Sequence, residues 1–243
     1  AMITEVHPTG IVSVVSDGAF DITWAAMRGL WDFSGRDNRV PDDAEIKKRL
    51  PLVNYRDVQL DYDKKTVFLK KKGMAIGLGG IAKGYAADKA MEIVSKRGVK
   101  NAILKAGGDM RVQGAEDGRH WKIGIRDPRR KDRNLAVIEM TDASISTSGD
   151  YERFFEKDGV VYHHIMDPRT GYPARQARSV TITGPDTLTT DALSTAVFVL
   201  GVKDGLMLVE SLNGIEAVIV DAKGGIHGSS GIAKAIAGGN PPD

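Results

Sequence analysis

The chain has 243 residues, of which 42% are hydrophobic and 27% are charged, and its formal net charge is +2. This balance is ordinary for a globular protein and argues against nucleic acid or a strongly charged surface as the partner. The sequence contains no cysteine, which excludes thiolate catalysis, disulfides and cysteine-ligated metals. It shows no signal peptide, and no run is expected to reach the roughly 18 apolar residues of a membrane span.

Short elements separated by polar loops are expected in the first half of the chain. Alternating apolar and polar residues predict strands, whereas helical periodicity ended by glycine predicts a helix. The expected elements are a helical stretch across 24–31, a short helix at 45–53, a hairpin of 58–62 and 66–69, and a helix at 85–94.

The second half of the chain is expected to contain more strands and the longest apolar helix. Because strands and helices do not alternate regularly, the predicted fold class is α+β. We expect a single mixed domain across 1–243, in one body or two lobes, with antiparallel sheets packed against helices and a frayed tail at 237–243. The expected elements are strands at 101–104, 112, 121–125, 135–140, 144–148, 160–164 and 178–183, helices at 189–200 and 206–212, and a hairpin of 217–220 and 225–229.

Asp191 and Thr195 stand out because they are polar residues in the apolar helix predicted at 189–200. Residues four apart lie on the same side of a helix, one turn from each other. A carboxylate and a hydroxyl in that arrangement suit Mg²⁺, which takes oxygen ligands and often shares them with a phosphate. The alternative is structural: Asp191 caps its own helix and Thr195 bonds back to the preceding turn.

A glycine-rich segment, residues 77–84, lies between a predicted strand and a predicted helix. Glycines let the backbone approach a phosphate, and the following helix N-terminus offers free N–H groups. The segment is not a P-loop, because Gly84 follows Lys83 where Ser or Thr is required, and it is a poor dinucleotide fingerprint. Phosphate binding and simple tight packing both remain open for it. Gly107-Gly108-Asp109, at a strand end, could be a turn that faces a ligand or a plain β-bulge, and both interpretations remain open.

His164 ends a predicted strand, three residues before Asp167. The pair could act as a base and the residue that orients it, or Asp167 could only shape the turn before Pro168. The sequence pattern alone leaves both interpretations open.

Several blocks, taken together and in order, resemble the ApbE family of flavin transferases over roughly residues 15–230. Each block alone is weak, but the combination is highly specific. The blocks are Gly18-Ala19-Phe20-Asp21 followed by Trp31, residues 78–88, Gly107-Gly108-Asp109, residues 148–151, residues 164–173, and residues 191–196.

The resemblance implies an enzyme that transfers FMN from FAD to a Thr or Ser hydroxyl of a target protein and releases AMP. It implies Mg²⁺ as cofactor, with Asp191, Thr195 and the Gly80 carbonyl as ligands, and His164 as the base for the acceptor hydroxyl. The residues expected to contact FAD are Ala19, Phe20, Asp21, Lys83, Gly107, Gly108, His164 and Ile165.

The chain also departs from the family pattern. Gly77 stands where the family commonly has Asp, and only 17 residues precede Gly18, whereas family members usually carry a longer segment there. An FAD pyrophosphatase and a non-catalytic FAD-binding lipoprotein are the alternative functions. The family is largely exported to the periplasm or the outer face of the cytoplasmic membrane, often with a lipid anchor, and its acceptors include subunits of membrane redox complexes.

Overall fold

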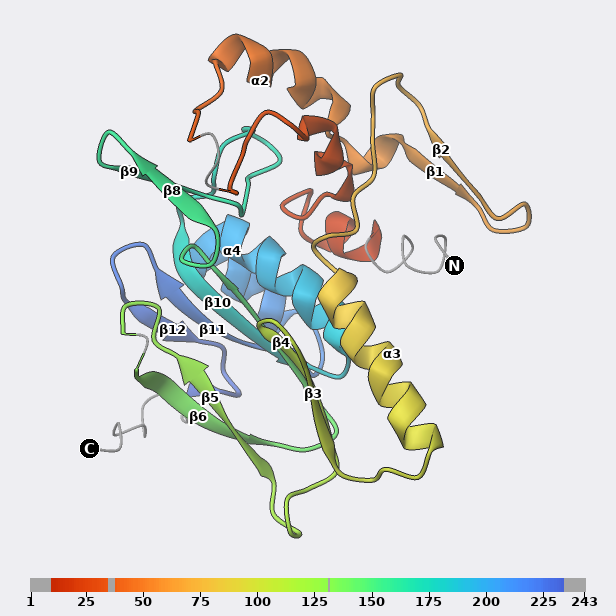
Figure 1. Cartoon of the computed structure of the whole chain (residues 1–243), viewed down its shortest axis with the longest axis vertical. Coiled ribbons are helices and arrows are strands. Elements are labelled where there is room, and N and C mark those ends of the chain that lie inside the picture. Colours follow the sequence, from red (N-terminus) through yellow and green to blue (C-terminus); the bar gives the residue numbers. More distant parts are fainter. Residues whose placement is uncertain (1–9, 35–37, 131, 234–243) are drawn as a thin grey trace.

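A six-stranded antiparallel sheet lies at the centre of the computed structural model, which describes residues 10–34, 38–130 and 132–233 (Figure 1). The strands are β1 (Val58–Asp61), β2 (Thr66–Leu69), β3 (Ala102–Ala106), β4 (Asp109–Gln113), β5 (Trp121–Arg126), β6 (Asn134–Met140), β7 (Ser144–Gly149), β8 (Phe154–Lys157), β9 (Val160–His163), β10 (Ala177–Gly184), β11 (Glu216–Asp221) and β12 (Ile226–Gly228). The helices are α2 (Asp43–Arg49), α3 (Ala82–Lys96) and α4 (Thr187–Glu210), with 3₁₀ turns η1 (Ile22–Met27), η2 (Leu50–Leu52) and η3 (Tyr55–Asp57); residues 10–15 are also helical.

The main sheet has the strand order β12-β11-β10-β7-β4-β3, and three two-stranded sheets pair β1 with β2, β5 with β6, and β8 with β9. Side chains of successive strand residues point to opposite faces. Accordingly, Val180 and Ile219 pack in the core cluster with α4, whereas Val218 packs in a second cluster with the β5–β6 hairpin. The arrangement is therefore a helical layer, the main sheet and a hairpin layer.

Helix α4 fills the helical layer and is apolar nearly all round. Its most apolar 18-residue window has a mean hydropathy of 1.7, which reaches the length and composition of a membrane span, so the expectation that no run would do so is wrong. Of that window, 61% is buried inside the protein, as in the core helix of a globular domain. Gly201, with φ 77°, interrupts the helix directly after position 200, where the first of the two predicted helices ends.

The α+β fold class with antiparallel sheets is confirmed, and most predicted elements are present. The helix predicted across 24–31 is only the 3₁₀ turn η1, because Gly29 follows with a left-handed φ of 83°. Strand β8 was not among the predicted elements. Asp158 and Gly159, both at positive φ, form the turn between β8 and β9, and an Asp-Gly pair is a strong hairpin signal. The predicted frayed tail lies outside the described residues, and the single-domain boundaries remain a prediction.

Candidate functional site

The candidate site lies where the N-termini of α3 and α4 meet (Figure 1). Asp88 of α3 accepts hydrogen bonds from the first backbone N–H groups of α4, at 3.0 Å from Thr187 and 2.9 Å from Leu188. In return, Asp191 of α4 accepts a hydrogen bond from the Gly84 backbone N–H of α3 at 3.1 Å. The two helices therefore cap each other, which satisfies N–H groups that have no partner within their own helix.

Gly84 is the residue that permits this approach. A Cβ added there would lie 2.2 Å from the Thr187 carbonyl oxygen, far inside van der Waals contact. Tight packing therefore explains Gly84, and the packing brings the start of α3 to the second turn of α4.

Asp191 is not the cap of its own helix, so the structural alternative for this residue is wrong. The cap is Asp186, whose side chain accepts from the Thr189 N–H at 2.8 Å, and α4 has already run for a full turn when it reaches Asp191. The Asp191 carboxylate is 3% exposed and faces Lys83, whose Nζ lies 3.1 Å from Oδ1 and 3.3 Å from Oδ2.

A second buried carboxylate, Asp109, completes this group. It is the first residue of β4, directly after the Gly107-Gly108 turn, and is 1% exposed. Its Oδ2 lies 2.8 Å from Lys83 Nζ, an ion-pair distance, but the approach does not have regular hydrogen-bond geometry and Oδ2 makes no hydrogen bond to the described residues. Gly107 and Gly108 of this turn were predicted to contact FAD, but Asp109 was not among the predicted site residues.

The environment of this group shifts the pKa of Asp191 and that of Lys83. Burial raises the pKa of Asp191 to about 6, and the neighbouring Asp109 carboxylate adds to the rise. Burial works to lower the pKa of Lys83, but the two carboxylates outweigh it and raise that pKa above its usual value. When all three groups are ionised, two carboxylates face one ammonium, so the group has one uncompensated negative charge.

This donor set fits a hard divalent cation. Carboxylate, hydroxyl and carbonyl oxygens are what Mg²⁺ takes, and the uncompensated negative charge favours a cation. The described residues contain no cluster of three or more His, Cys, Asp and Glu side chains that could hold a metal. A cation bound to Asp191 would therefore need a hydroxyl or carbonyl oxygen as a further protein ligand. Thr195 and the Gly80 carbonyl are the predicted partners.

Thr195 lies one turn after Asp191 on α4, as the sequence predicts, and is half-buried. Its hydroxyl lies 3.4 Å from the Ser148 hydroxyl of β7. A row of hydroxyl pairs, each 2.8–2.9 Å long, fixes the register of α4 on β7: Ser144 with Thr187, Ser146 with Thr190, and Ser148 with Ser194.

The glycine-rich segment packs against the predicted Ala19-Phe20-Asp21 block. Ala19 and Phe20 are buried, and a Cβ added at Gly80 would lie 3.0 Å from the Phe20 ring. Asp21 caps η1: its carboxylate accepts from the backbone N–H and hydroxyl of Thr23 and from the Tyr55 N–H. Burial raises the pKa of Asp21, and these hydrogen bonds oppose the rise. A contact of this block with FAD remains a prediction.

The Gly107-Gly108 turn lies beside Lys83. Gly107 has a φ of 67°, and a Cβ added there would lie 3.5 Å from the Lys83 side chain. A Cβ on Gly108 would lie 3.1 Å from the Thr147 carbonyl oxygen. The left-handed φ of Gly107 and the close approach of Gly108 to Thr147 therefore both favour glycine in this turn, and contact of the two glycines with FAD stays a prediction.

The two histidines at the end of β9, His163 and His164, have different environments. His163 is buried, its Nε2 lies 2.8 Å from the Ala174 carbonyl oxygen, and burial lowers its pKa to about 4, so it is a neutral structural residue. His164 is exposed, and its Nδ1 lies 3.3 Å from the Arg153 carbonyl oxygen. If Nδ1–H donates to that carbonyl, Nε2 keeps its lone pair, as a base requires.

His164 also belongs to the electrostatic surroundings of Lys83. Partial loss of hydration lowers the pKa of His164, and the charges of Arg153 and Lys83 lower it further. Ile165, next in sequence, packs its side chain in the main core, its backbone N–H donates to His163 Nδ1 and its carbonyl accepts from the Ala174 N–H, so its contact with FAD stays a prediction. The described contacts thus bring Lys83, Asp191 and Asp109 together directly, and His164 lies within the electrostatic influence of Lys83.

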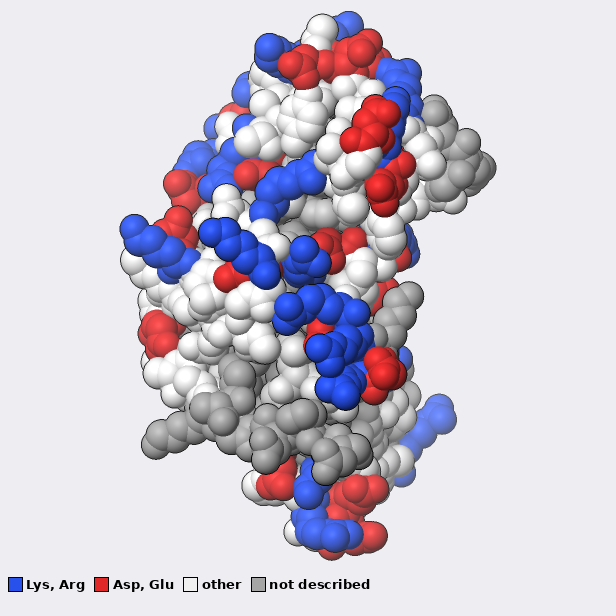
Figure 2. Space-filling view, turned by 90° about the vertical axis from the view of Figure 1, so that its left-hand side faces the viewer, with Lys and Arg blue, Asp and Glu red and all other residues white. Residues whose placement is uncertain are grey.

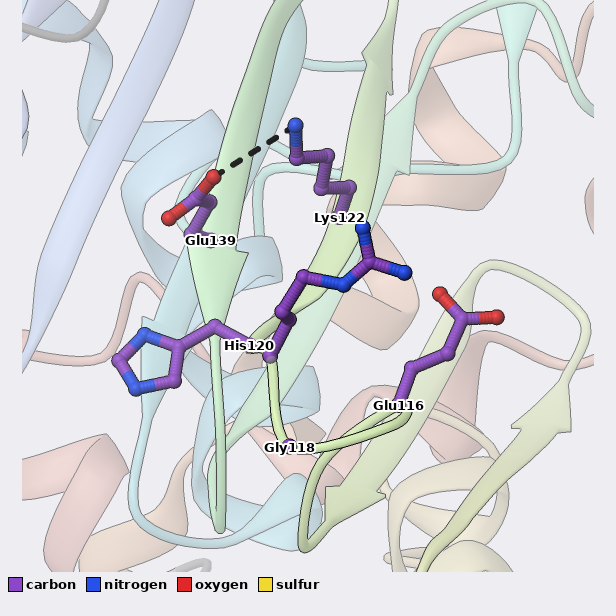
Figure 3. Close-up of a pocket in the computed structure, with 6 residues that line it drawn as sticks. Glu116, Gly118, His120, Lys122 and Glu139 are labelled. Atoms are coloured by element: carbon purple, nitrogen blue, oxygen red, sulfur yellow. Dashed lines mark ion pairs between the residues drawn. The ribbon is translucent and has the colours of Figure 1, made fainter.

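Two surface hollows lie away from this group. One, about 450 Å³, is lined by Glu116, Gly118, Arg119, His120, Lys122 and Glu139 at the β5–β6 hairpin. In Figure 3 the Lys122 ammonium points toward Glu139, 3.8 Å away, and His120 points away from both. The other, about 510 Å³, borders α3 and β4 and includes Asp88 and Asp186. Neither contains a predicted site residue.

The surface charges have mixed sign on the face shown in Figure 2, where Lys and Arg side chains gather across the middle with Asp and Glu side chains among and around them. This mixture agrees with the small net charge of the chain.

Comparisons with known proteins agree with the resemblance read from the sequence. A sequence model of the ApbE family matches residues 9–219. FAD:protein FMN transferases from Klebsiella pneumoniae and Treponema pallidum are 37% and 36% identical to this chain, over 86% and 91% of its length. The chain spans only about two-thirds of those relatives, 65% and 66% of their lengths.

Solved structures of ApbE proteins also resemble this chain in fold. The crystal structure of the ApbE protein from Thermotoga maritima superposes with a TM-score of 0.88 at 40% identity, covering 96% of this chain and 77% of that one. The apo flavinyl transferase ApbE from Pseudomonas stutzeri gives a TM-score of 0.83 at 32% identity, covering 97% and 75%.

Proposed function

The chain belongs to the ApbE family, and we propose that it transfers FMN from FAD to a Thr or Ser hydroxyl of a target protein, with Mg²⁺ as cofactor. The observation that supports this most directly is the meeting of Lys83 with two buried carboxylates at the start of two helices. Strongly perturbed ionisable groups of this kind cluster at functional sites.

The residues would divide the chemistry as follows. Asp191, Thr195 and the Gly80 carbonyl would hold Mg²⁺, which neutralises negative charge on a pyrophosphate when bound. Lys83 would contact a phosphate oxygen with its ammonium. His164 would accept the proton of the acceptor hydroxyl through Nε2.

The reaction balances with these groups alone. The acceptor oxygen forms a bond to the phosphorus of the FMN half, the bond from that phosphorus to the bridging oxygen breaks, and AMP leaves with the bridging oxygen. The hydroxyl proton goes to His164, whose lowered pKa keeps it neutral and able to accept at neutral pH. If water replaces the hydroxyl, the same groups give FMN and AMP.

Mass spectrometry after incubation with FAD, Mg²⁺ and a candidate acceptor tests the proposal. A mass gain of one FMN on the acceptor, with AMP released, supports transfer. Free FMN and AMP without a modified acceptor indicate a pyrophosphatase, and unchanged FAD that stays bound indicates a storage protein. Omission of Mg²⁺ should abolish the reaction.

We also propose that the acceptor is a subunit of a membrane redox complex and that the whole protein acts at the periplasmic or outer face of the cytoplasmic membrane, anchored there through a lipid. Both proposals depend on the family alone. Fractionation of the full-length protein in its own cells tests the location, since recovery in the cytoplasmic fraction contradicts it.

A further inference from the structure

Among the described residues, two buried carboxylates lie within ion-pair distance of Lys83, and the proposed chemistry uses Asp191 but not Asp109. Asp191 has both oxygens engaged: Lys83 Nζ lies 3.1 Å from Oδ1, and the Gly84 N–H donates to Oδ2. A cation that binds Asp191 must therefore displace Lys83 from it or share it with Lys83.

The two partners of Lys83 differ in mobility. The Lys83 side chain is 48% exposed and flexible, so its ammonium can move, whereas Asp109 is 1% exposed and begins a strand that pairs with β3 and β7. The ammonium already lies closer to Asp109, at 2.8 Å, than to Asp191, at 3.1 Å. Asp109 Oδ2 makes no hydrogen bond to another described residue that would compete for it.

We propose that Asp109 is a positioning residue that holds the Lys83 ammonium when Asp191 releases it to the divalent cation. The inference rests on the proposed function, because it requires Mg²⁺ at Asp191. In this arrangement Lys83 stays charged and beside the site, where it can contact a phosphate. Without Asp109, Asp191 is the only carboxylate left within ion-pair distance of Lys83 among the described residues, so the ammonium and the cation compete for it directly.

Mg²⁺ affinity measured by calorimetry without FAD tests this. We expect Asp109→Asn to weaken Mg²⁺ binding by roughly 10–100-fold, the range found for residues that orient metal ligands. Asp127→Asn, which removes a half-buried carboxylate directly after β5, should leave the affinity unchanged. The decisive comparison repeats Asp109→Asn in a Lys83→Met background, where the competing ammonium is gone and the effect should shrink to about 3-fold or less.

Equal weakening in both backgrounds overturns the inference, because it means that Asp109 acts on the cation directly. Unchanged affinity in Asp109→Asn, with only a lower melting temperature, also overturns it and leaves a purely structural residue. Wild-type protein that binds no Mg²⁺ contradicts the proposed metal site itself, which separates that failure from failure of the inference.

Amine labelling of Lys83, read by mass spectrometry, gives a second measurement should the Lys83→Met variant not fold. In the wild type, Mg²⁺ should leave Lys83 as protected as before, because Asp109 retains it. In Asp109→Asn, Mg²⁺ should release Lys83 and raise its labelling several-fold. Labelling that Mg²⁺ raises equally in both proteins contradicts the positioning role.

Discussion

Replacing Gly84 by alanine tests whether the close approach of α3 and α4 builds the site. The added Cβ would lie 2.2 Å from the Thr187 carbonyl oxygen, and ordinary contact begins near 3.4 Å, so the helices must separate by about 1 Å. That movement would lengthen the hydrogen bond that the Gly84 N–H donates to Asp191, now 3.1 Å, beyond hydrogen-bond range.

The expected cost follows from three contributions. Overpacking destabilises the fold by ~1–3 kcal/mol, and loss of a hydrogen bond to a charged group by ~1.5–3 kcal/mol. Alanine in place of a helical glycine stabilises the helix by ~1 kcal/mol, which partly offsets these two losses. We expect Gly84→Ala to lower the free energy of unfolding by ~1.5–5 kcal/mol and to weaken Mg²⁺ binding, because Asp191 shifts relative to α3. Urea unfolding followed by tryptophan fluorescence, together with calorimetry, measures both.

Gly79→Ala is the matched control, since a Cβ there meets nothing within 4 Å and the residue has no left-handed φ. It should unfold at nearly the wild-type urea concentration. A Gly84→Ala variant as stable as Gly79→Ala would refute the reasoning that these helices are in contact at this point.

Four further predictions concern three ionisable residues. His163 is buried neutral, with its pKa lowered to about 4, so the unfolded chain binds a proton that the folded chain does not, and stability falls as the pH drops from about 6.5 toward 4. Unfolding at pH 7 and pH 4.5 should show that loss, up to ~3 kcal/mol, in the wild type and in an exposed-site control, His120→Gln, but not in His163→Gln. His164→Ala should stop FMN transfer while FAD stays bound, as followed by mass spectrometry and flavin fluorescence; loss of FAD binding would make His164 a binding residue. Asp191→Ala should abolish Mg²⁺-dependent turnover, and undiminished activity would remove Asp191 from the ligand set. In the metal-free protein at pH 7, Asp191→Asn should be more stable than the wild type by up to ~3 kcal/mol, because a pKa raised to about 6 makes the ionised form unfavourable in the fold; lower stability at pH 7 contradicts this.

The sequence allowed good prediction wherever the signal is local. The spacing of Asp191 and Thr195 depends only on helical periodicity, and both residues lie on α4 as predicted. The β1–β2 hairpin and α3 also follow from alternation and from glycine stops, and both are present. The Asp-Gly turn at 158–159 is a local signal too, so β8 could have been predicted from it.

Relations between distant parts of the chain could not be predicted in this way. Lys83, Asp109 and Asp191 are joined only by tertiary packing, through ion pairs that span 26 and 108 positions. Nothing in the pattern around Asp88 shows that it caps a helix 99 positions later. Asp21 is assigned to FAD by family resemblance alone; its carboxylate accepts hydrogen bonds from Thr23 and Tyr55, and its contact with FAD remains a prediction.

The site itself carries a cost in stability that the surrounding packing must offset. Two carboxylates that are 1% and 3% exposed share one ammonium, and the raised pKa of Asp191 shows that its charge is poorly compensated. A divalent cation would supply the missing positive charge. Asparagine at position 191 would instead remove the negative charge, so that no further positive charge is needed. If selection acted on stability alone, a neutral residue would serve better at position 191. The buried charge is therefore best explained by a ligand that the site is built to bind, and both the stability gained in Asp191→Asn and the turnover lost in Asp191→Ala follow from that single cause.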